Sequence, residues 1–125
     1  MTTIRNFIVV AILAGLFVII GGAAFADDGS TPLHQAAEDG NITEVKRLIA
    51  GGVDIEAKTN TGYTPLLAAA WYGQTETAPA LVKAGADVFA RGDGEMPLDI
   101  AIEKHGKDSE IAHVLRETME KQGGK

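Results

Sequence analysis

An internal repeat of 33 residues constrains the fold of this chain more than any other feature. Residues 62–73 read G-Y-T-P-L-L-A-A-A-W-Y-G, and residues 29–40, one period earlier, read G-S-T-P-L-H-Q-A-A-E-D-G. The match continues beyond these stretches, as the pairing of Leu48 with Leu81 shows. Self-similarity at a fixed period of this length is typical of solenoids, in which each copy stacks on the next.

The second copy predicts a short inner helix with defined ends. Thr64 can cap a helix whose first position is the following proline, and Gly73 can leave that helix in a left-handed conformation. Leu66, Ala69 and Ala70 then share one face of the helix. Because alanine side chains are small, we expect a neighbouring helix to approach this face closely.

A second, outer helix follows in each copy. It is expected at residues 75–83 in the second copy and at residues 43–50 in the first. Pro79 lies near the start of its helix and lacks an N–H, so we predict a displaced or late start there. The residues expected to be buried by these helices are Leu81 and Val82, and in the first copy Val45, Leu48 and Ile49.

A third copy begins 32 residues after the second, because the loop before it is one residue short. Met96 replaces the capping threonine, and Asp99 stands where the first copy has His34. The outer helix of this copy should expose a polar face made by Glu110, His113 and Glu117, as a terminal cap would. The predicted boundaries are residues 27–60, 61–92 and 93–117 for the three copies, with a frayed tail at 118–125.

No single copy can bury its apolar face alone, so the sequence predicts an all-α solenoid of stacked helix-turn-helix units joined by β-hairpin-like loops. The chain resembles ankyrin repeats in its 33-residue period and in four motifs. These are T-P-L-H at residues 31–34, T-P-L at 64–66, A-A-x-x-G in two copies and G-A-D-V at 85–88. The resemblance implies a protein-binding module. It also implies a structural His34, hydrogen-bonded near the helix start and to the adjoining hairpin.

The first 26 residues are interpreted as a secretory signal peptide. Arg5 precedes an apolar run, and a small-x-small pattern places cleavage between Ala26 and Asp27. The alternative is an uncleaved anchor, because no charged residue occurs between Arg5 and Asp27. Either reading predicts export, and we expect a periplasmic or secreted protein, with the bacterial periplasm favoured.

Charge and cysteine content narrow the classes of partner. The net charge is −6, which disfavours nucleic acid and anionic membrane surfaces as partners. The chain has no cysteine, so thiol chemistry, disulfides and a lipid anchor on cysteine are excluded. Contact with a membrane is expected only if the N-terminal segment is retained, and the protein is expected to be monomeric.

Neither the histidines nor the carboxylates predict catalysis. His34, His105 and His113 lie in separate contexts without metal-ligand spacing. Carboxylate pairs such as Glu38 and Asp39 are expected to be charged side chains exposed to solvent. We therefore expect a protein that is not an enzyme and that needs neither a cofactor nor a metal. An enzyme or small-ligand binder would need a deep pocket with convergent polar groups, which three thin repeats rarely enclose.

The aromatic residues give the most specific indication of function. In ankyrin repeats, the hairpin tips and the two residues before the A-A-x-x-G glycine line the concave binding surface. By position, the partner-binding residues are Tyr63, Trp71, Tyr72, Asn60, Thr61, Glu38, Asp39, Glu103 and Lys104, with Asp28, Ser30, Asp93 and Glu95 beside them. Aromatic anchors with a polar rim fit a protein interface. The alternative is that Trp71 only covers the neighbouring copy's helix. A membrane-tethered scaffold or accessory subunit is the second functional hypothesis.

Overall fold

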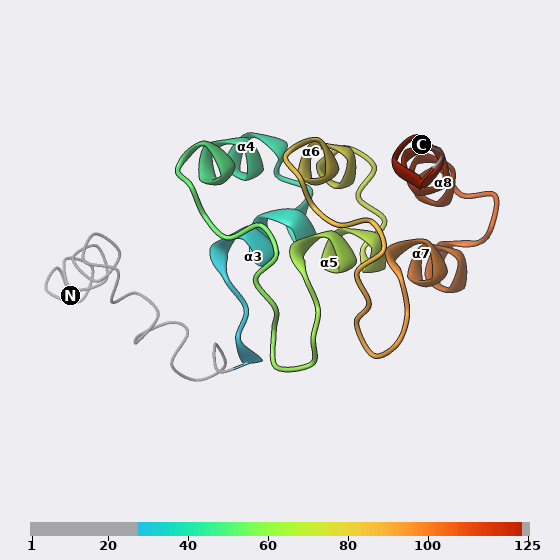
Figure 1. Ribbon diagram of the computed structural model, residues 1–125, viewed down its shortest axis with the longest axis horizontal. Coiled ribbons are helices and arrows are strands. Elements are labelled where there is room, and N and C mark those ends of the chain that lie inside the picture. Colours follow the sequence, from blue (N-terminus) through green and yellow to red (C-terminus); the bar gives the residue numbers. More distant parts are fainter. Residues whose placement is uncertain (1–27, 124–125) are drawn as a thin grey trace, which may run out of the picture.

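The computed structural model describes residues 28–123, in which the helices form two layers (Figure 1). The inner layer contains α3 (Pro32–Asp39), α5 (Pro65–Trp71) and α7 (Pro97–His105). The outer layer contains α4 (Ile42–Ala50), α6 (Thr77–Lys83) and α8 (Glu110–Gly123). Long loops leave the inner layer on the side away from the outer helices (Figure 1). The expected helical solenoid is confirmed. The predictions for residues 1–26 and for cleavage after Ala26 lie outside the described residues.

The inner helices begin as the sequence predicts. The Thr31 hydroxyl accepts a hydrogen bond from the His34 N–H at the start of α3, and the Thr64 hydroxyl accepts one from the Leu67 N–H at the start of α5. Gly73 follows α5 with a positive φ of 70°, a left-handed conformation that glycine adopts without steric cost. Helices α3 and α5 are therefore bounded by a capping threonine at the start and a left-handed glycine, Gly40 or Gly73, after the end, whereas α7 has no side-chain cap at Met96.

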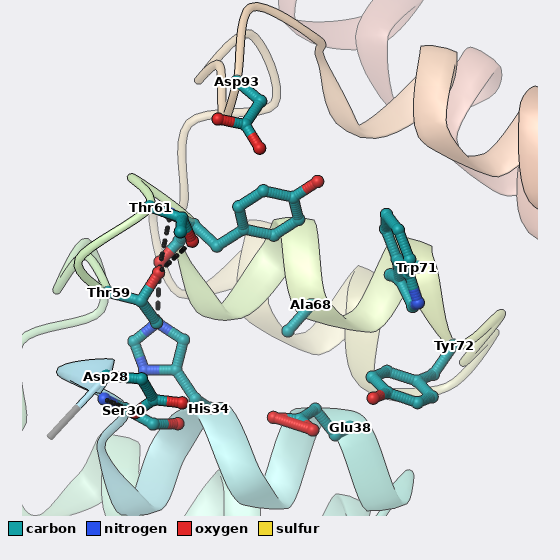
Figure 2. A pocket seen from close by; sticks show the side chains of 11 residues that line it. Asp28, Ser30, His34, Glu38, Thr59, Thr61, Ala68, Trp71, Tyr72 and Asp93 are labelled. Atoms are coloured by element: carbon teal, nitrogen blue, oxygen red, sulfur yellow. Dashed lines mark hydrogen bonds between the residues drawn. The ribbon is translucent and has the colours of Figure 1, made fainter. Parts of the chain in front are cut away.

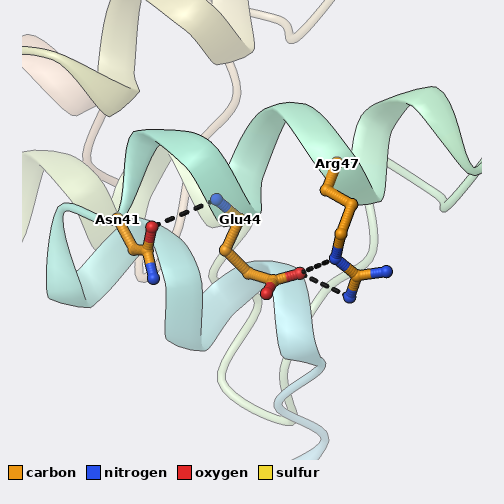
Figure 3. A network of polar contacts seen from close by, with 3 residues as sticks. All are labelled: Asn41, Glu44 and Arg47. Atoms are coloured by element: carbon orange, nitrogen blue, oxygen red, sulfur yellow. Dashed lines mark hydrogen bonds and ion pairs between the residues drawn. The ribbon is translucent and has the colours of Figure 1, made fainter.

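Two outer helices begin in different ways. At α4, the Asn41 side chain accepts a hydrogen bond from the Glu44 N–H, and Arg47 pairs with the Glu44 carboxylate (Figure 3). At α6, the helix starts at Thr77 without a side-chain cap, two residues later than the repeat alone would place it. The late start predicted from Pro79 is confirmed.

Small and branched residues form one core that runs through all three copies. Ala37, Ala69 and Ala70 have no exposed surface, because α3 and α5 pack directly against one another. In the middle copy, Leu66 and Leu81 are at most 1% exposed. In this stack α5 contacts both α3 and α7, and α6 contacts both α4 and α8. The central copy is therefore covered on both sides.

The first copy's outer helix is less buried than expected. Val45 has no exposed surface, but Leu48 and Ile49 are only partly buried. They were predicted to be core residues like Leu81, and the difference follows from position, because α4 contacts α6 on one side only. An end repeat has no outer neighbour within the described residues.

The C-terminal helix is longer than predicted. Helix α8 runs to Gly123, so the prediction of a frayed tail is wrong for residues 118–123. Met119 packs partly buried against the core and holds this last part of the helix to the fold. Glu110, His113 and Glu117 are exposed, as predicted for a terminal cap. Within residues 28–123, none of the helices has both the length and the apolar character needed to cross a bilayer.

Candidate functional site

An open groove of about 430 Å³ lies on the loop side of the inner helices (Figure 2). We call it the concave groove. The lining residues expected from the repeat positions are Asp28, Ser30, Glu38, Thr61, Tyr63, Trp71, Tyr72 and Asp93. Three others were not expected, namely His34, Thr59 and Ala68. Most of the lining comes from the first and second copies.

Trp71 is held from two sides and yet remains accessible. The Lys104 ammonium from α7 lies 3.9 Å from the centroid of the Trp71 ring, a cation–π contact. The Tyr63 ring meets Trp71 edge to face, with centroids 6.1 Å apart. Even so, 39% of the Trp71 surface is exposed. The residue thus packs against the next copy and also presents a surface to the groove.

Tyr72 and Glu38 face each other across the first and second copies (Figure 2). Tyr72 is 53% exposed, and neither Trp71 nor Tyr72 belongs to the buried core. Burial raises the pKa of Glu38 above its ordinary value of 4.5, and the charges of Asp39 and Asp28 raise it further, whereas a hydrogen bond from the Tyr72 hydroxyl opposes the shift. Negative charge is thus concentrated at this end of the groove.

The raised pKa of Glu38 makes the stability of the fold depend on pH. The folded protein holds this proton more tightly than the unfolded chain does. The contribution of Glu38 to the free energy of unfolding therefore falls as the pH rises above about 4.5, through the raised folded pKa. At neutral pH, the ionised carboxylate costs the folded state some stability.

Tyr63 packs between Trp71 of its own copy and the loop that leads to the third copy. Gly92 is buried beneath it, and a Cβ at Gly92 would lie 2.8 Å from the Tyr63 Cδ1 and 3.0 Å from the Leu67 Cδ1. Only glycine at position 92 lets the loop of residues 91–96 approach the Tyr63 ring so closely. Burial raises the pKa of Tyr63, and the charges of Asp93, Glu95 and Glu103 raise it further. Acidic groups of the third copy therefore face this end of the groove.

His34 fixes the hairpin that carries Tyr63. Its Nε2 donates to the Tyr63 carbonyl at 2.8 Å, and its Nδ1 accepts from the Thr31 N–H at 3.1 Å. A carbonyl can only accept and an N–H can only donate, so the ring is the tautomer with the proton on Nε2. The structural role implied for His34 is confirmed. In the third copy, Asp99 accepts from the Met96 N–H at 3.2 Å, which replaces half of this arrangement.

Side chains from the following copy close the ends of the inner helices. The Gln74 amide donates to the Glu38 carbonyl at 2.5 Å, and His105 Nε2 donates to the Trp71 carbonyl at 2.8 Å. These carbonyls belong to the last helical turns and have no partner within their own helices. The repeat pattern did not predict this role for His105, because Gln74 and His105 are different residue types and do not occupy equivalent positions of the repeat.

The remaining predicted binding residues lie beside the groove. Asp39 accepts a hydrogen bond from the Gln35 amide at 3.2 Å, and the Asn60 N–H donates to the Asp28 carbonyl at 2.7 Å. Glu103 pairs with Lys104 at 3.3 Å, the same lysine that covers Trp71. These four residues border the lining without forming it, and their part in binding stays a prediction.

The histidines near the groove are engaged in hydrogen bonds to the main chain. The Nε2 atoms of His34 and His105 each donate to a main-chain carbonyl, so both rings support the fold. Among the described residues, no group of histidine, aspartate and glutamate side chains is arranged to hold a metal ion. Two exposed aromatic rings and several carboxylates are what the groove offers to a ligand.

Comparison with known proteins gives a family match and several relatives. A family model described as ankyrin repeats in three copies matches residues 8–92. Mouse protein phosphatase 1 regulatory subunit 27 is 40% identical over 73 residues, which are 58% of this chain and 47% of the relative. Mouse protein phosphatase 1 regulatory subunit 12A is 39% identical over 104 residues, which are 82% of this chain and 10% of the relative. The chain spans about half the length of the first of these relatives and much less of the second.

Proposed function

The chain belongs to the ankyrin-repeat family, and we propose that it binds another protein through its concave groove without catalysing a reaction. Ankyrin repeats are protein interaction modules, and this coarser role follows from the family. The concave groove as the place of contact is the proposal. Two relatives are named as regulatory subunits of protein phosphatase 1, and their partner is not assigned to this chain.

The observation that carries the proposal is the pair of exposed aromatic residues at the end of α5. Trp71 and Tyr72 are 39% and 53% exposed, and both line the groove. Large exposed apolar side chains in a hollow rimmed by polar groups are typical of protein interaction sites. Tryptophan and tyrosine are also the residue types that most often dominate binding energy.

Replacing Trp71 and Tyr72 together by alanine should abolish capture of the partner. Each aromatic anchor typically contributes at least about 2 kcal/mol, or about 30-fold in affinity, so the double variant should lose well over 100-fold. The measurement is affinity capture with the purified protein from the exported fraction, followed by titration of the captured partner. Circular dichroism should show an unchanged helical fold, because neither side chain belongs to the buried core.

Phe89 provides the matched control for this experiment. It is 43% exposed and does not line the groove, so Phe89→Ala removes a similar ring from another surface. Partner binding should be unaffected in this variant. Equal losses in the control and in the double variant would show that the groove is not the site.

We also propose that the protein is exported and acts outside the cytoplasm. The support comes from the apolar run after Arg5 and the small-x-small pattern at Ala26. Mass spectrometry of the protein purified from its source should find a mature chain that begins at Asp27. A chain that retains residues 1–26 would instead favour the membrane-tethered scaffold or accessory subunit.

A further inference from the structure

Carboxylates surround the aromatic part of the concave groove. Asp28, Glu38 and Asp93 line it directly. The charges of Asp39, Glu95 and Glu103 also reach it, since they act on Glu38 or on Tyr63. These acidic groups come from the first and third copies, so they lie on both sides of the central aromatic residues. We call them the acidic rim.

Little positive charge is available nearby to neutralise the acidic rim. Lys104 is engaged with the Trp71 ring and with Glu103, 3.3 Å away. Arg91 donates from Nη1 to the Gly94 carbonyl at 2.6 Å and keeps its positive charge, so Lys104 and Arg91 together can offset only part of the six carboxylates of the rim. Among the described residues, Asp28, Glu38 and Asp93 form no ion pair. Most of the negative charge of the rim is therefore left for a ligand.

The aromatic residues of the groove suit a cation as well as an apolar group. Lys104 already shows that the Trp71 ring accepts an ammonium group at 3.9 Å. The Tyr72 ring is more exposed than Trp71 and lies beside Glu38 (Figure 2). A guanidinium group can stack on such a ring and hydrogen-bond to a carboxylate at the same time. The combination favours arginine, and next lysine, over uncharged side chains.

We propose that the concave groove binds a basic segment of the partner protein, with arginine or lysine side chains placed between the exposed aromatic rings and the acidic rim. This inference rests on the proposed function and specifies the chemistry of the partner. The cavity of about 430 Å³ is open and has room for a few side chains of a peptide. Nucleic acid would be repelled by the same charges.

The test uses a labelled dodecapeptide of alternating arginine and serine, and a second peptide in which citrulline replaces arginine. Citrulline keeps the shape of the side chain but carries no charge. Trp71 is the only tryptophan of the chain, so its fluorescence reports on the groove itself. The arginine peptide should change Trp71 emission and raise the anisotropy of the label, and its affinity should fall steeply with added salt. The citrulline peptide should bind at least tenfold more weakly.

Two triple variants separate the groove from the overall negative charge. The groove variant combines Glu38→Gln, Asp93→Asn and Glu95→Gln. Asparagine is chosen at Asp93 because that residue has a positive φ of 56°, which asparagine tolerates. The control variant combines Glu76→Gln, Glu117→Gln and Glu120→Gln, which removes the same charge from exposed positions before α6 and on α8.

The groove variant should bind the arginine peptide at least tenfold more weakly, and the control variant should stay within about twofold of the original protein. Unchanged Trp71 emission, or losses in the two variants that differ by less than fivefold, would overturn the inference. Glu38→Gln alone is a second variant, chosen because it should not destabilise the fold. It should not lower the unfolding temperature at neutral pH, since it removes a carboxylate that the folded state holds at a cost.

Failure of this inference can be told apart from failure of the proposed function. If the arginine peptide does not bind but a captured partner still depends on Trp71 and Tyr72, the groove is a binding site for a different chemistry. If a captured partner is insensitive to both residues, the groove itself is the wrong site.

Discussion

Replacing Leu66 by alanine is expected to lower the free energy of unfolding by about 2–5 kcal/mol. Leu66 is 1% exposed and lies on α5, the inner helix that packs against both of its neighbours. Alanine would lose the burial of the removed methyl groups and would leave a cavity that the stacked helices cannot close. A domain of this size is stable by roughly 5–15 kcal/mol, so the loss removes much of the total.

Chemical denaturation followed by circular dichroism measures this loss. Leu98 is the matched control, because it is the counterpart of Leu66 in the third copy and is only partly buried. Leu98→Ala should cost clearly less than Leu66→Ala. Equal costs for the two variants would mean that the middle copy is not packed more tightly than the last one, contrary to the two-sided contacts of α5.

This difference between equivalent positions explains which parts of the fold the sequence could predict. The capping threonine, the alanine pair and the closing glycine recur in the first two copies, so Thr64, Gly73 and Ala70 could be placed from the repeat alone. Burial at the ends of the stack depends on whether a neighbour is present, and a repeat pattern does not contain that information. Leu48 was for this reason predicted to be more buried than it is.

The groove could be predicted in outline but not in its supporting contacts. The aromatic residues differ from their counterparts in the other copies, and this difference marked them. Lys104 over Trp71, His105 on the Trp71 carbonyl and Gly92 beneath Tyr63 each join residues far apart in the sequence. The Trp71 carbonyl has an equivalent in the first copy, where Gln74 donates to the Glu38 carbonyl, but a different side chain from a different position makes each contact, so the repeat pattern does not predict the donor.

Replacing His34 by alanine is expected to lower the free energy of unfolding by about 2–4 kcal/mol, from a cavity and from lost hydrogen bonds. His34 is 1% exposed, and both of its ring nitrogens are engaged. The change should also loosen the hairpin of Tyr63, whose ring packs on Trp71. Trp71 emission should therefore shift in the folded variant, while exposed His113 replaced by alanine should change neither quantity.

A leucine at position 34 separates the two causes of this loss. The second copy already holds Leu67 there, fully buried, so the volume is compatible with the fold. His34→Leu should retain most of the packing but leave the Thr31 N–H without the ring acceptor, at a cost of about 1–3 kcal/mol. The Tyr63 carbonyl would keep its bond from the Thr59 N–H at 2.9 Å, which limits the damage. A leucine variant as stable as the original protein would show that the histidine contributes by filling space alone, and the Tyr63 hairpin would then have to be held by Gly92 and Leu67 from the other side.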